Sequence, residues 1–380
     1  MSLDISEPIA APRVPFVDLA AMDTDLRRGL REAFERVLAT GRFSAGQEVP
    51  AFEDALAQEV GVDFAVGVAS GTAALALMLI GAGIGPGDEV ILPANTFFAT
   101  LEAVVTAGAV PVLADAELAT GSVDPASVEA AVTARTAAIL GVHLYGTPVD
   151  ADRLRAIATR HGLLFLEDAA QAIGARWNGR PAGALGDGAA FSFYPTKNLG
   201  ALGEAGAVTT NDEALARRVR SLRSHGEVVK NVHHEYGFNE RLDELQAAFL
   251  SVKLARLRRE VEARRALGED YRRLLADVPR VGVLDVPHRA QSSYHLFVVK
   301  VDHRDNVAAF LRSNGVETAV HYPTPIHLQP ACRPLGLGKG AFPNAERLAD
   351  TVLSLPFFPG LSREQAHHCV QAVSAATAGE

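Results

Sequence analysis

Three polar segments that directly follow apolar runs carry residue types able to do chemistry. The first is Ser70-Gly71-Thr72, which stands between a strand-like run and a helical pattern. Small residues there let backbone N–H groups approach an anion, and the N-terminus of a helix favours negative charge. The hydroxyl of Thr72 adds another hydrogen-bonding group. The segment indicates a phosphate site, and an ordinary tight turn is the alternative.

The second segment ends in Asp168, at the end of the apolar run Leu163–Leu166 and next to Glu167. The carboxyl edge of a parallel sheet is where open α/β folds bind their ligands. A carboxylate there could bind a metal, contact a ribose or neutralise a protonated ring nitrogen. It could equally cap the following helix.

The third segment presents Lys197 after the aromatic-rich run Ala190–Phe193, 29 residues beyond Asp168. The chain contains 31 Arg and only five Lys, and Lys197 is the first of those five. Lysine can lose its proton and form a Schiff base, whereas arginine stays protonated. Ser192 could reach a phosphate, and Tyr194 could reach a substrate. A phosphate turn, a strand-end Asp and a strand-end Lys together predict a pyridoxal 5'-phosphate site.

Short apolar runs alternate with helical patterns from about residue 60 to 210, which predicts an α/β fold with a mostly parallel sheet flanked by helices. An N-terminal helix is expected over Asp25–Thr40, closed by Gly41. The expected strands are Phe64–Ala69, Glu89–Leu92, Val110–Leu113, Ala138–His143, Leu163–Leu166, Ala190–Phe193 and Ala207–Thr209. The expected helices between them include Thr72–Ile80, Phe97–Ala107, Ala126–Val132 and Ala151–Arg160.

The pattern changes past Arg241, where Arg241–Val278 predicts one long helical region rich in Arg and Glu. A strand over Tyr294–Val301, a helix over Asn306–Ser313, a strand over Thr318–His321 and two terminal helices should follow. We therefore expect a large cofactor-binding domain over residues 1–250 and a smaller α+β domain over residues 251–380, begun by the long helix.

Composition narrows the functional classes. The 380 residues carry a net charge of -9, which argues against a broad contact with nucleic acid or anionic lipid. Two cysteines cannot form a disulfide framework or a four-thiolate metal site. The uncharged stretch Phe64–Gly87 fits a buried strand–helix unit better than a membrane span. Since residues 1–16 lack the pattern of a signal peptide, a cytoplasmic protein is expected.

Other candidate sites are weaker. The glycines of Gly81–Gly85 follow a helix and precede a strand, the reverse of a dinucleotide-binding turn. The pairs His233-His234 and His367-His368 lack further ligands at metal-binding spacing, so no metal site is expected. Cys332 has no evident activating base, which disfavours a desulfurase.

The chain resembles the nucleotide-sugar aminotransferases of the DegT/DnrJ/StrS family, which belong to the fold-type-I pyridoxal-phosphate enzymes. The similarity extends from PFVDL at Pro15–Leu19 to SLPFFPGLS at Ser354–Ser362. Its specific blocks are GVASGTAAL, NTFFAT, VHLYG, EDAAQAIGA, FSFYPTKNLGALGEAGA, GFNERLDELQAA and HYPTPIHLQPA. Two departures from the family pattern are Ala73 and Ala205, and neither removes a group that the chemistry needs.

The resemblance implies roles for individual residues. Lys197 would form the Schiff base with the cofactor and move protons, and Asp168 would pair with the pyridine nitrogen. Phe97 would stack on the cofactor ring, and Gln171 would bind the ring hydroxyl.

The resemblance also implies how phosphate and substrate are held. Gly71, Thr72 and Ser192 would hold the cofactor phosphate. Asn239 would reach that phosphate from the neighbouring subunit, making a homodimer with shared active sites. Three further residues match positions that contact substrate in related sugar aminotransferases: Tyr194, His321 and Tyr322.

The function implied is transfer of an amino group from an amino acid, expected to be L-glutamate, through the pyridoxamine 5'-phosphate form of the cofactor. The acceptor would be a keto group on a dTDP- or UDP-linked hexose, favoured at carbon 3 of a 6-deoxy sugar by the segment FYPTKNLGALG. The alternatives are a 4-keto-sugar or inosose aminotransferase, a pyridoxal-phosphate-dependent sugar dehydratase and a non-catalytic regulator. Lys197 argues against the dehydratase, and the intact set of Lys197, Asp168 and Gln171 argues against the regulator.

Overall fold

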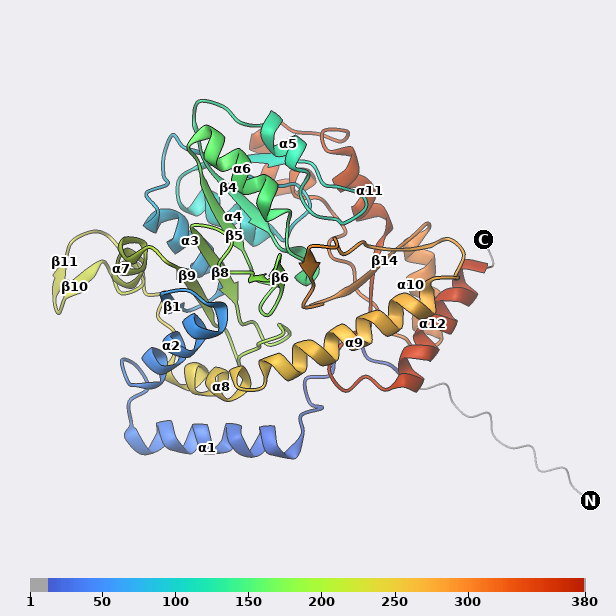
Figure 1. Ribbon diagram of the computed structural model, residues 1–380, viewed down its shortest axis with the longest axis horizontal. Coiled ribbons are helices and arrows are strands. Elements are labelled where there is room, and N and C mark those ends of the chain that lie inside the picture. The colour runs from blue at the N-terminus through green and yellow to red at the C-terminus, as the bar shows by residue number, and fades with distance from the viewer. Residues whose placement is uncertain (1–12, 379–380) are drawn as a thin grey trace, which may run out of the picture.

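A seven-stranded sheet forms the centre of the computed structural model, which describes residues 13–378 (Figure 1). β9 runs antiparallel to both of its neighbours, and the other neighbouring pairs are parallel, so the predicted mostly parallel α/β sheet is confirmed. The strands, in their order across the sheet, are β1 (Phe64–Val68), β9 (Gly206–Thr210), β8 (Gly188–Ser192), β5 (Leu164–Asp168), β4 (Thr136–Val142), β2 (Glu89–Pro93) and β3 (Val110–Ala114).

Helices cover both faces of this sheet, which explains why its central strands are continuous apolar runs. One face packs against helices α3 (Gly71–Gly81), α4 (Phe98–Thr106) and α7 (Glu213–Leu222). The other face packs against helices α2 (Glu48–Val60), α5 (Pro125–Ala130), α6 (Ala151–His161) and α8 (Glu244–Leu254). β1 followed by α3 accounts for the uncharged stretch Phe64–Gly87 as a buried unit, as expected. Within residues 13–378, no helix is long and apolar enough to span a bilayer.

The N-terminal helix α1 (Thr24–Thr40) confirms the helix expected over Asp25–Thr40. Its apolar face, which includes Leu26, Leu30 and Val37, packs on Ala248 and Phe249 of α8. Figure 1 shows α1 running below α8 at the lower edge of the molecule.

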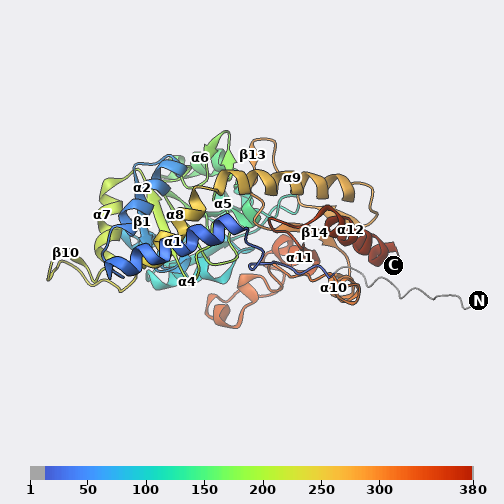
Figure 2. The ribbon, with the colours of Figure 1, turned by 90° about the horizontal axis from the view of Figure 1, so that it is seen from below.

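A second, three-stranded sheet lies at the other end of the molecule in the order β12 (Val281–Val283), β14 (Phe297–Val301) and β15 (Val352–Leu355). Figures 1 and 2 show the long helix α9 (Leu257–Leu275) extending from the central sheet toward this second sheet. The remaining helices are α10 (Arg304–Ser313), α11 (Pro343–Thr351) and α12 (Arg363–Ala378). α10, α11 and α12 confirm the helix over Asn306–Ser313 and the two terminal helices.

Two expected elements differ from the structure. The single helical region over Arg241–Val278 is two helices, because the chain turns at Ala255–Arg256. The turn allows α8 to pack against α1 and α2 while α9 continues to α12 and β12. The strand expected over Thr318–His321 is absent: only Ala319 pairs, as an isolated bridge to Ser354.

The expected domain boundary between residues 250 and 251 falls inside α8, and the two-domain division stays a prediction. Two small sheets complete the described chain. One consists of β6 (Arg176–Trp177), β7 (Arg180–Pro181) and β13 (Ala290–Gln291). The other is a hairpin of β10 (Glu227–Val229) and β11 (Val232–His233), which projects from the body next to α7 (Figures 1 and 2).

Candidate active site

A cavity of about 440 Å³ lies where the central strands end, and it gathers most of the residues expected to act. Because the carboxyl ends of β2, β4, β5 and β8 meet at one edge of the sheet, the loops that follow them face a common space. Of the eleven predicted site residues, ten line this cavity: Gly71, Thr72, Phe97, Asp168, Gln171, Ser192, Tyr194, Lys197, His321 and Tyr322.

The phosphate turn at the start of α3 is closely packed. Ser70 caps the helix, its hydroxyl accepting from the amide of Ala73 at 3.1 Å. A Cβ on Gly71 would lie 2.5 Å from the Cβ of Ser192, and a Cβ on Gly206 would lie 2.3 Å from the carbonyl oxygen of Ser70. Glycine is therefore needed at both positions to bring α3, β8 and β9 together. This cradle fits a phosphate group, since helix N-terminal amides and the side chains of Thr72 and Ser192 meet there.

Asp168 ends β5 and is 5 % exposed. Its Oδ2 accepts from the hydroxyl of Thr100 at 2.8 Å, and its Oδ1 accepts from the amide of Ala170 at 3.1 Å. Burial raises the pKa of Asp168, while Thr100, Ala170 and the charge of Lys197 act in the opposite direction. The site thus holds a carboxylate whose charge is best stabilised when a cation, such as a protonated ring nitrogen, faces it.

Lys197 lies in the loop after β8, where its amide donates to the carbonyl of Tyr194 at 2.8 Å. Removal from water lowers the pKa of Lys197 to about 8, and the negative charge of Asp168 partly offsets that effect. Roughly a tenth of the amine is therefore unprotonated at pH 7. An amine in this state can act as a nucleophile and as a proton carrier.

Gln171 is fixed by two neighbours. Its Oε1 accepts from the amide of Tyr145 at 2.6 Å, and its Nε2 donates to the hydroxyl of Tyr322 at 3.1 Å. Among residues 13–378 the other hydrogen of Nε2 has no acceptor, so it can face a ring hydroxyl. Burial raises the pKa of Tyr322, so this phenol stays protonated.

Two aromatic side chains expose much of their surface within the cavity lining. Phe97, which precedes α4, is 53 % exposed, and its ring lies 5.4 Å from that of Tyr322. Tyr194 is 47 % exposed. An exposed aromatic face beside a polar cradle suits stacking on a planar ring.

Two histidines line the cavity near Lys197. Burial and the charge of Lys197 lower the pKa of His321 to about 4, and its Nδ1 lies 2.9 Å from the hydroxyl of Ser354. His295, which the sequence did not single out, is buried, and its pKa is well below the usual value for the same two reasons, burial first. Both imidazoles are neutral at physiological pH.

Sequence reasoning also missed Thr100 and Tyr145, which bind Asp168 and Gln171 respectively. Both lie in blocks that carry the family resemblance, NTFFAT and VHLYG. Their partners are 68 and 26 residues away along the chain, so local spacing held no signal of either contact.

Asn239 does not line this cavity in its own chain. It is exposed, just beyond the projecting hairpin, and forms an isolated bridge with Ser224. Its predicted contact with a neighbouring subunit's cofactor stays a prediction.

The weaker candidates all lie outside this cavity. Within residues 13–378 no group of three potential metal ligands is present. Cys332 is buried, and burial raises the pKa of its thiol, which disfavours a thiolate nucleophile. Gly81–Gly85 spans the end of α3, away from any strand-to-helix turn.

Comparison with known proteins gives the class to which this fold and site belong. The sequence matches the DegT/DnrJ/EryC1/StrS aminotransferase family over residues 25–374. It is 51 % identical to the erythromycin biosynthesis sensory transduction protein EryC1 of Saccharopolyspora erythraea, over 95 % of this chain and 99 % of that protein. It is 46 % identical to the dTDP-3-amino-3,4,6-trideoxy-alpha-D-glucose transaminase of Streptomyces venezuelae, over 97 % of each chain.

The fold is similar to the crystal structure of S. venezuelae DesV in complex with a ketimine intermediate, with a TM-score of 0.94 and 47 % identity over 96 % of this chain and 98 % of that one. The chain belongs to the DegT/DnrJ/EryC1/StrS aminotransferase family. It is a pyridoxal-phosphate-dependent aminotransferase of fold type I, which confirms the predicted fold, enzyme class and cofactor.

Proposed function

We propose that this enzyme transfers the amino group of an amino acid, L-glutamate, to the keto group of a dTDP- or UDP-linked hexose, at carbon 3 of a 6-deoxy sugar. The observation that carries the proposal is the pairing of Lys197, whose amine has a pKa of about 8, with the buried Asp168 in one cavity. The preference for carbon 3 is supported by the similar transaminase whose name specifies a dTDP-linked 3-amino sugar.

Pyridoxal phosphate supplies an aldehyde that can carry the amino group and a ring that withdraws electrons from it. Gly71, Thr72 and Ser192 would bind its phosphate, and Phe97 would lie against its ring. Asp168 would hold a proton at the ring nitrogen by its negative charge.

The chain's own proton chemistry centres on Lys197. The amine would bind the cofactor covalently at rest and, once released, would carry a proton to and from the substrate carbon. A pKa of about 8 suits this work, because both the protonated and the neutral forms are populated near neutral pH. Gln171, held by Tyr145 and Tyr322, would orient the ring hydroxyl.

The sugar would lie on the open side of the cavity, beside Tyr194, His321 and Tyr322. Since burial and Lys197 lower the pKa of His321 to about 4, its imidazole is neutral and can exchange hydrogen bonds with sugar hydroxyls without adding charge.

The active unit would be a homodimer in which Asn239 of one subunit reaches the phosphate of the other. This part of the proposal is supported by the exposure of Asn239 outside its own cavity. A cytoplasmic location stays an expectation from the sequence.

The test is to incubate the enzyme with L-glutamate and a panel of 3-keto and 4-keto dTDP- and UDP-hexoses, with scyllo-inosose added as a further acceptor. Mass spectrometry of the products, with fragmentation to locate the nitrogen, should find amination at carbon 3. Amination only at carbon 4, only of the inosose, or loss of water without gain of nitrogen would refute the proposal.

A regulatory function is the second candidate, because one similar protein bears a sensory transduction name. The complete set of Lys197, Asp168 and Gln171 in one cavity supports catalysis instead. Failure of the protein to convert any amino donor with bound cofactor would favour the regulatory function.

A further inference from the structure

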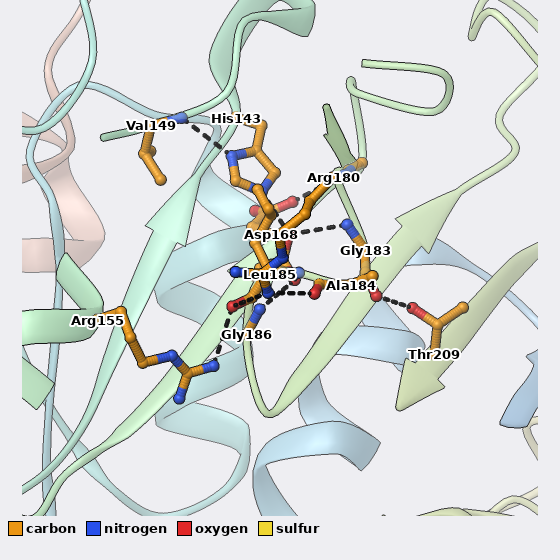
Figure 3. Close-up of polar contacts among 12 residues, drawn as sticks. His143, Val149, Arg155, Asp168, Arg180, Gly183, Ala184, Leu185, Gly186 and Thr209 are labelled. Carbon is orange, nitrogen blue, oxygen red and sulfur yellow. Dashed lines mark hydrogen bonds and ion pairs between the residues drawn. The ribbon is translucent and has the colours of Figure 1, made fainter. Parts of the chain in front are cut away.

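Glu167, the residue before Asp168, is fully buried on the face of β5 that points away from the active-site cavity. Its carboxylate accepts three backbone hydrogen bonds, from Gly183 at 2.7 Å, Leu185 at 2.8 Å and Gly186 at 2.6 Å. His143, also fully buried, lies 2.8 Å from the same carboxylate through Nε2. Figure 3 shows His143 and the backbone of Gly183–Gly186 gathered around this point.

The hydrogen bonds define the protonation of this pair. The amide of Val149 donates to Nδ1 of His143 at 3.2 Å, so Nδ1 carries no proton (Figure 3). A neutral imidazole then has its proton on Nε2, which donates to Glu167. Four N–H donors thus converge on one carboxylate, which is the arrangement that stabilises a buried negative charge.

This pair is joined directly to Asp168 through the backbone. Glu167 directly precedes Asp168 in the chain, and the amide of His143 donates to the carbonyl oxygen of Asp168 at 3.0 Å. The side chain of Asp168, on the cavity face of β5, accepts from the hydroxyl of Thr100 and the amide of Ala170. A displacement of the end of β5 would therefore disturb both sets of bonds.

The loop that supplies the three amides is closely packed and leaves no space for a side chain at its glycines. A Cβ on Gly186 would lie 2.5 Å from the carbonyl oxygen of Phe165, and Gly183 has a φ of +97°. Arg155 donates to the carbonyl of Leu185 at 2.9 Å, which fixes the loop from outside. The donors around Glu167 are accordingly built in place before any cofactor binds.

We propose that Glu167 and His143 are positioning residues for Asp168, and that they hold the end of β5 from behind the sheet so that the Asp168 carboxylate meets the cofactor ring nitrogen. This inference rests on the role proposed above for Asp168. Neither Glu167 nor His143 lines the cavity. The titratable groups near Asp168 are Lys197 and Tyr322 in the cavity, and His143 and the adjacent Glu167 behind the sheet.

The first test is Glu167→Gln. An amide has one acceptor oxygen and two N–H hydrogens, so it cannot satisfy the four donors that converge there. The protein without cofactor is titrated with pyridoxal phosphate, and the pH midpoint of the visible absorption band is then measured at saturation. We expect at least tenfold weaker cofactor binding and a pH midpoint that differs from that of the original protein, because a misplaced Asp168 no longer holds the ring nitrogen protonated and the ring then withdraws fewer electrons from the Schiff base.

Glu89→Gln is the matched control. Glu89 is 3 % exposed and is the first residue of β2, so it lies at the end of the strand away from the cavity. It binds Thr133 and Arg135. Its variant should lower the melting temperature and leave the cofactor dissociation constant within about twofold of the original, since its bonds lie far from the ligand edge.

His143 supplies a second pair of variants, which decide the question if Glu167→Gln does not fold. In His143→Gln the amide can still donate to Glu167 and accept from Val149, whereas His143→Phe loses both bonds. We expect the Gln variant to keep cofactor affinity within about threefold and the Phe variant to lose at least tenfold, as a rescue by hydrogen bonding predicts.

Asp168→Asn, measured in the same way, separates the two proposals. If it leaves the pH midpoint unchanged, the role proposed for Asp168 fails. If it shifts the midpoint while Glu167→Gln and His143→Phe lower only the melting temperature, as Glu89→Gln does, the positioning role is overturned and the pair is merely structural.

Discussion

The hydroxyl of Thr100, near the start of α4, donates a hydrogen bond of 2.8 Å to Oδ2 of Asp168 at the end of β5. Thr100 in turn lies 2.9 Å from the hydroxyl of Thr96. A chain of two hydroxyls therefore reaches the carboxylate from the side of the cavity, while the amide of Ala170 holds its other oxygen.

Replacement of Thr100 by Val removes this bond at nearly constant volume. A hydrogen bond to a charged group is worth about 1.5–3 kcal/mol, so we expect cofactor binding to weaken roughly tenfold or more. Because Thr100 lowers the pKa of Asp168, its loss should raise that pKa further and move the acidic limb of the pH–activity profile to higher pH. Thr100→Ser keeps the hydroxyl and should behave like the original protein; equal losses in both variants would contradict this account.

Asp168→Asn should fold normally and lose activity by roughly a hundredfold or more, the order found when an electrostatic group is removed from an active site. The amide keeps the shape of the carboxylate and cannot supply its charge. Steady-state rates at saturating cofactor, together with circular dichroism, measure this. Activity within a fewfold of the original would mean that Asp168 does not act on the ring nitrogen.

Lys197 should carry the cofactor covalently. The purified protein should be yellow, lose its visible band on treatment with borohydride, and yield one modified peptide containing Lys197. Lys197→Ala should still bind the cofactor through Thr72, Ser192 and Phe97, and it should have no turnover. A modified peptide that contains another of the five lysines would disprove the assignment.

The pKa of about 8 predicts how fast the cofactor attaches to the free protein. Only the neutral amine is a nucleophile, so the rate constant should rise about tenfold per pH unit below pH 8 and level off above it. Stopped-flow absorption from pH 6 to 10 measures the profile. A rate that keeps rising to pH 10 would show that the lysine has its ordinary pKa of 10.5.

Asn239 can be tested by mixing two impaired proteins, Lys197→Ala and Asn239→Ala. If Asn239 serves the neighbouring subunit, a mixed dimer collects both lesions in one site and leaves the other site intact. Activity should then exceed that of either parent, with subunit exchange verified by native mass spectrometry. Confirmed exchange without recovered activity would assign Asn239 to its own subunit or to no site.

The sequence predicted the strands and helices that form the cavity because their signals are local. Alternating apolar runs and helical patterns identified the parallel sheet, and the ends of β5 and β8 identified Asp168 and Lys197. The strand expected over Thr318–His321 does not form, because a strand needs pairing along its length and only Ala319 finds a partner, Ser354. The residues that follow, His321 and Tyr322, line the cavity instead.

The supporting contacts were outside the reach of sequence reasoning. Thr100 and Asp168 are 68 residues apart, and His143 and Glu167 are 24 apart, so only the folded sheet brings them together. His295 belongs to the strand expected over Tyr294–Val301, but β14 begins only at Phe297, and His295 reaches the cavity from the segment before it. Chemistry that depends on one residue type at one strand end was predictable, and chemistry shared between distant segments was not.

The consecutive acids Glu167 and Asp168 also specify the alignment of β5 in the sheet. A slip of one residue would turn Glu167 toward the cavity and Asp168 toward the loop at Gly183–Gly186. The side chain of Asp is one methylene shorter, so it could not reach all three amides and His143, and buried N–H groups would lose their partners. Misaligned chains would therefore be selected against during folding, before any cofactor is present.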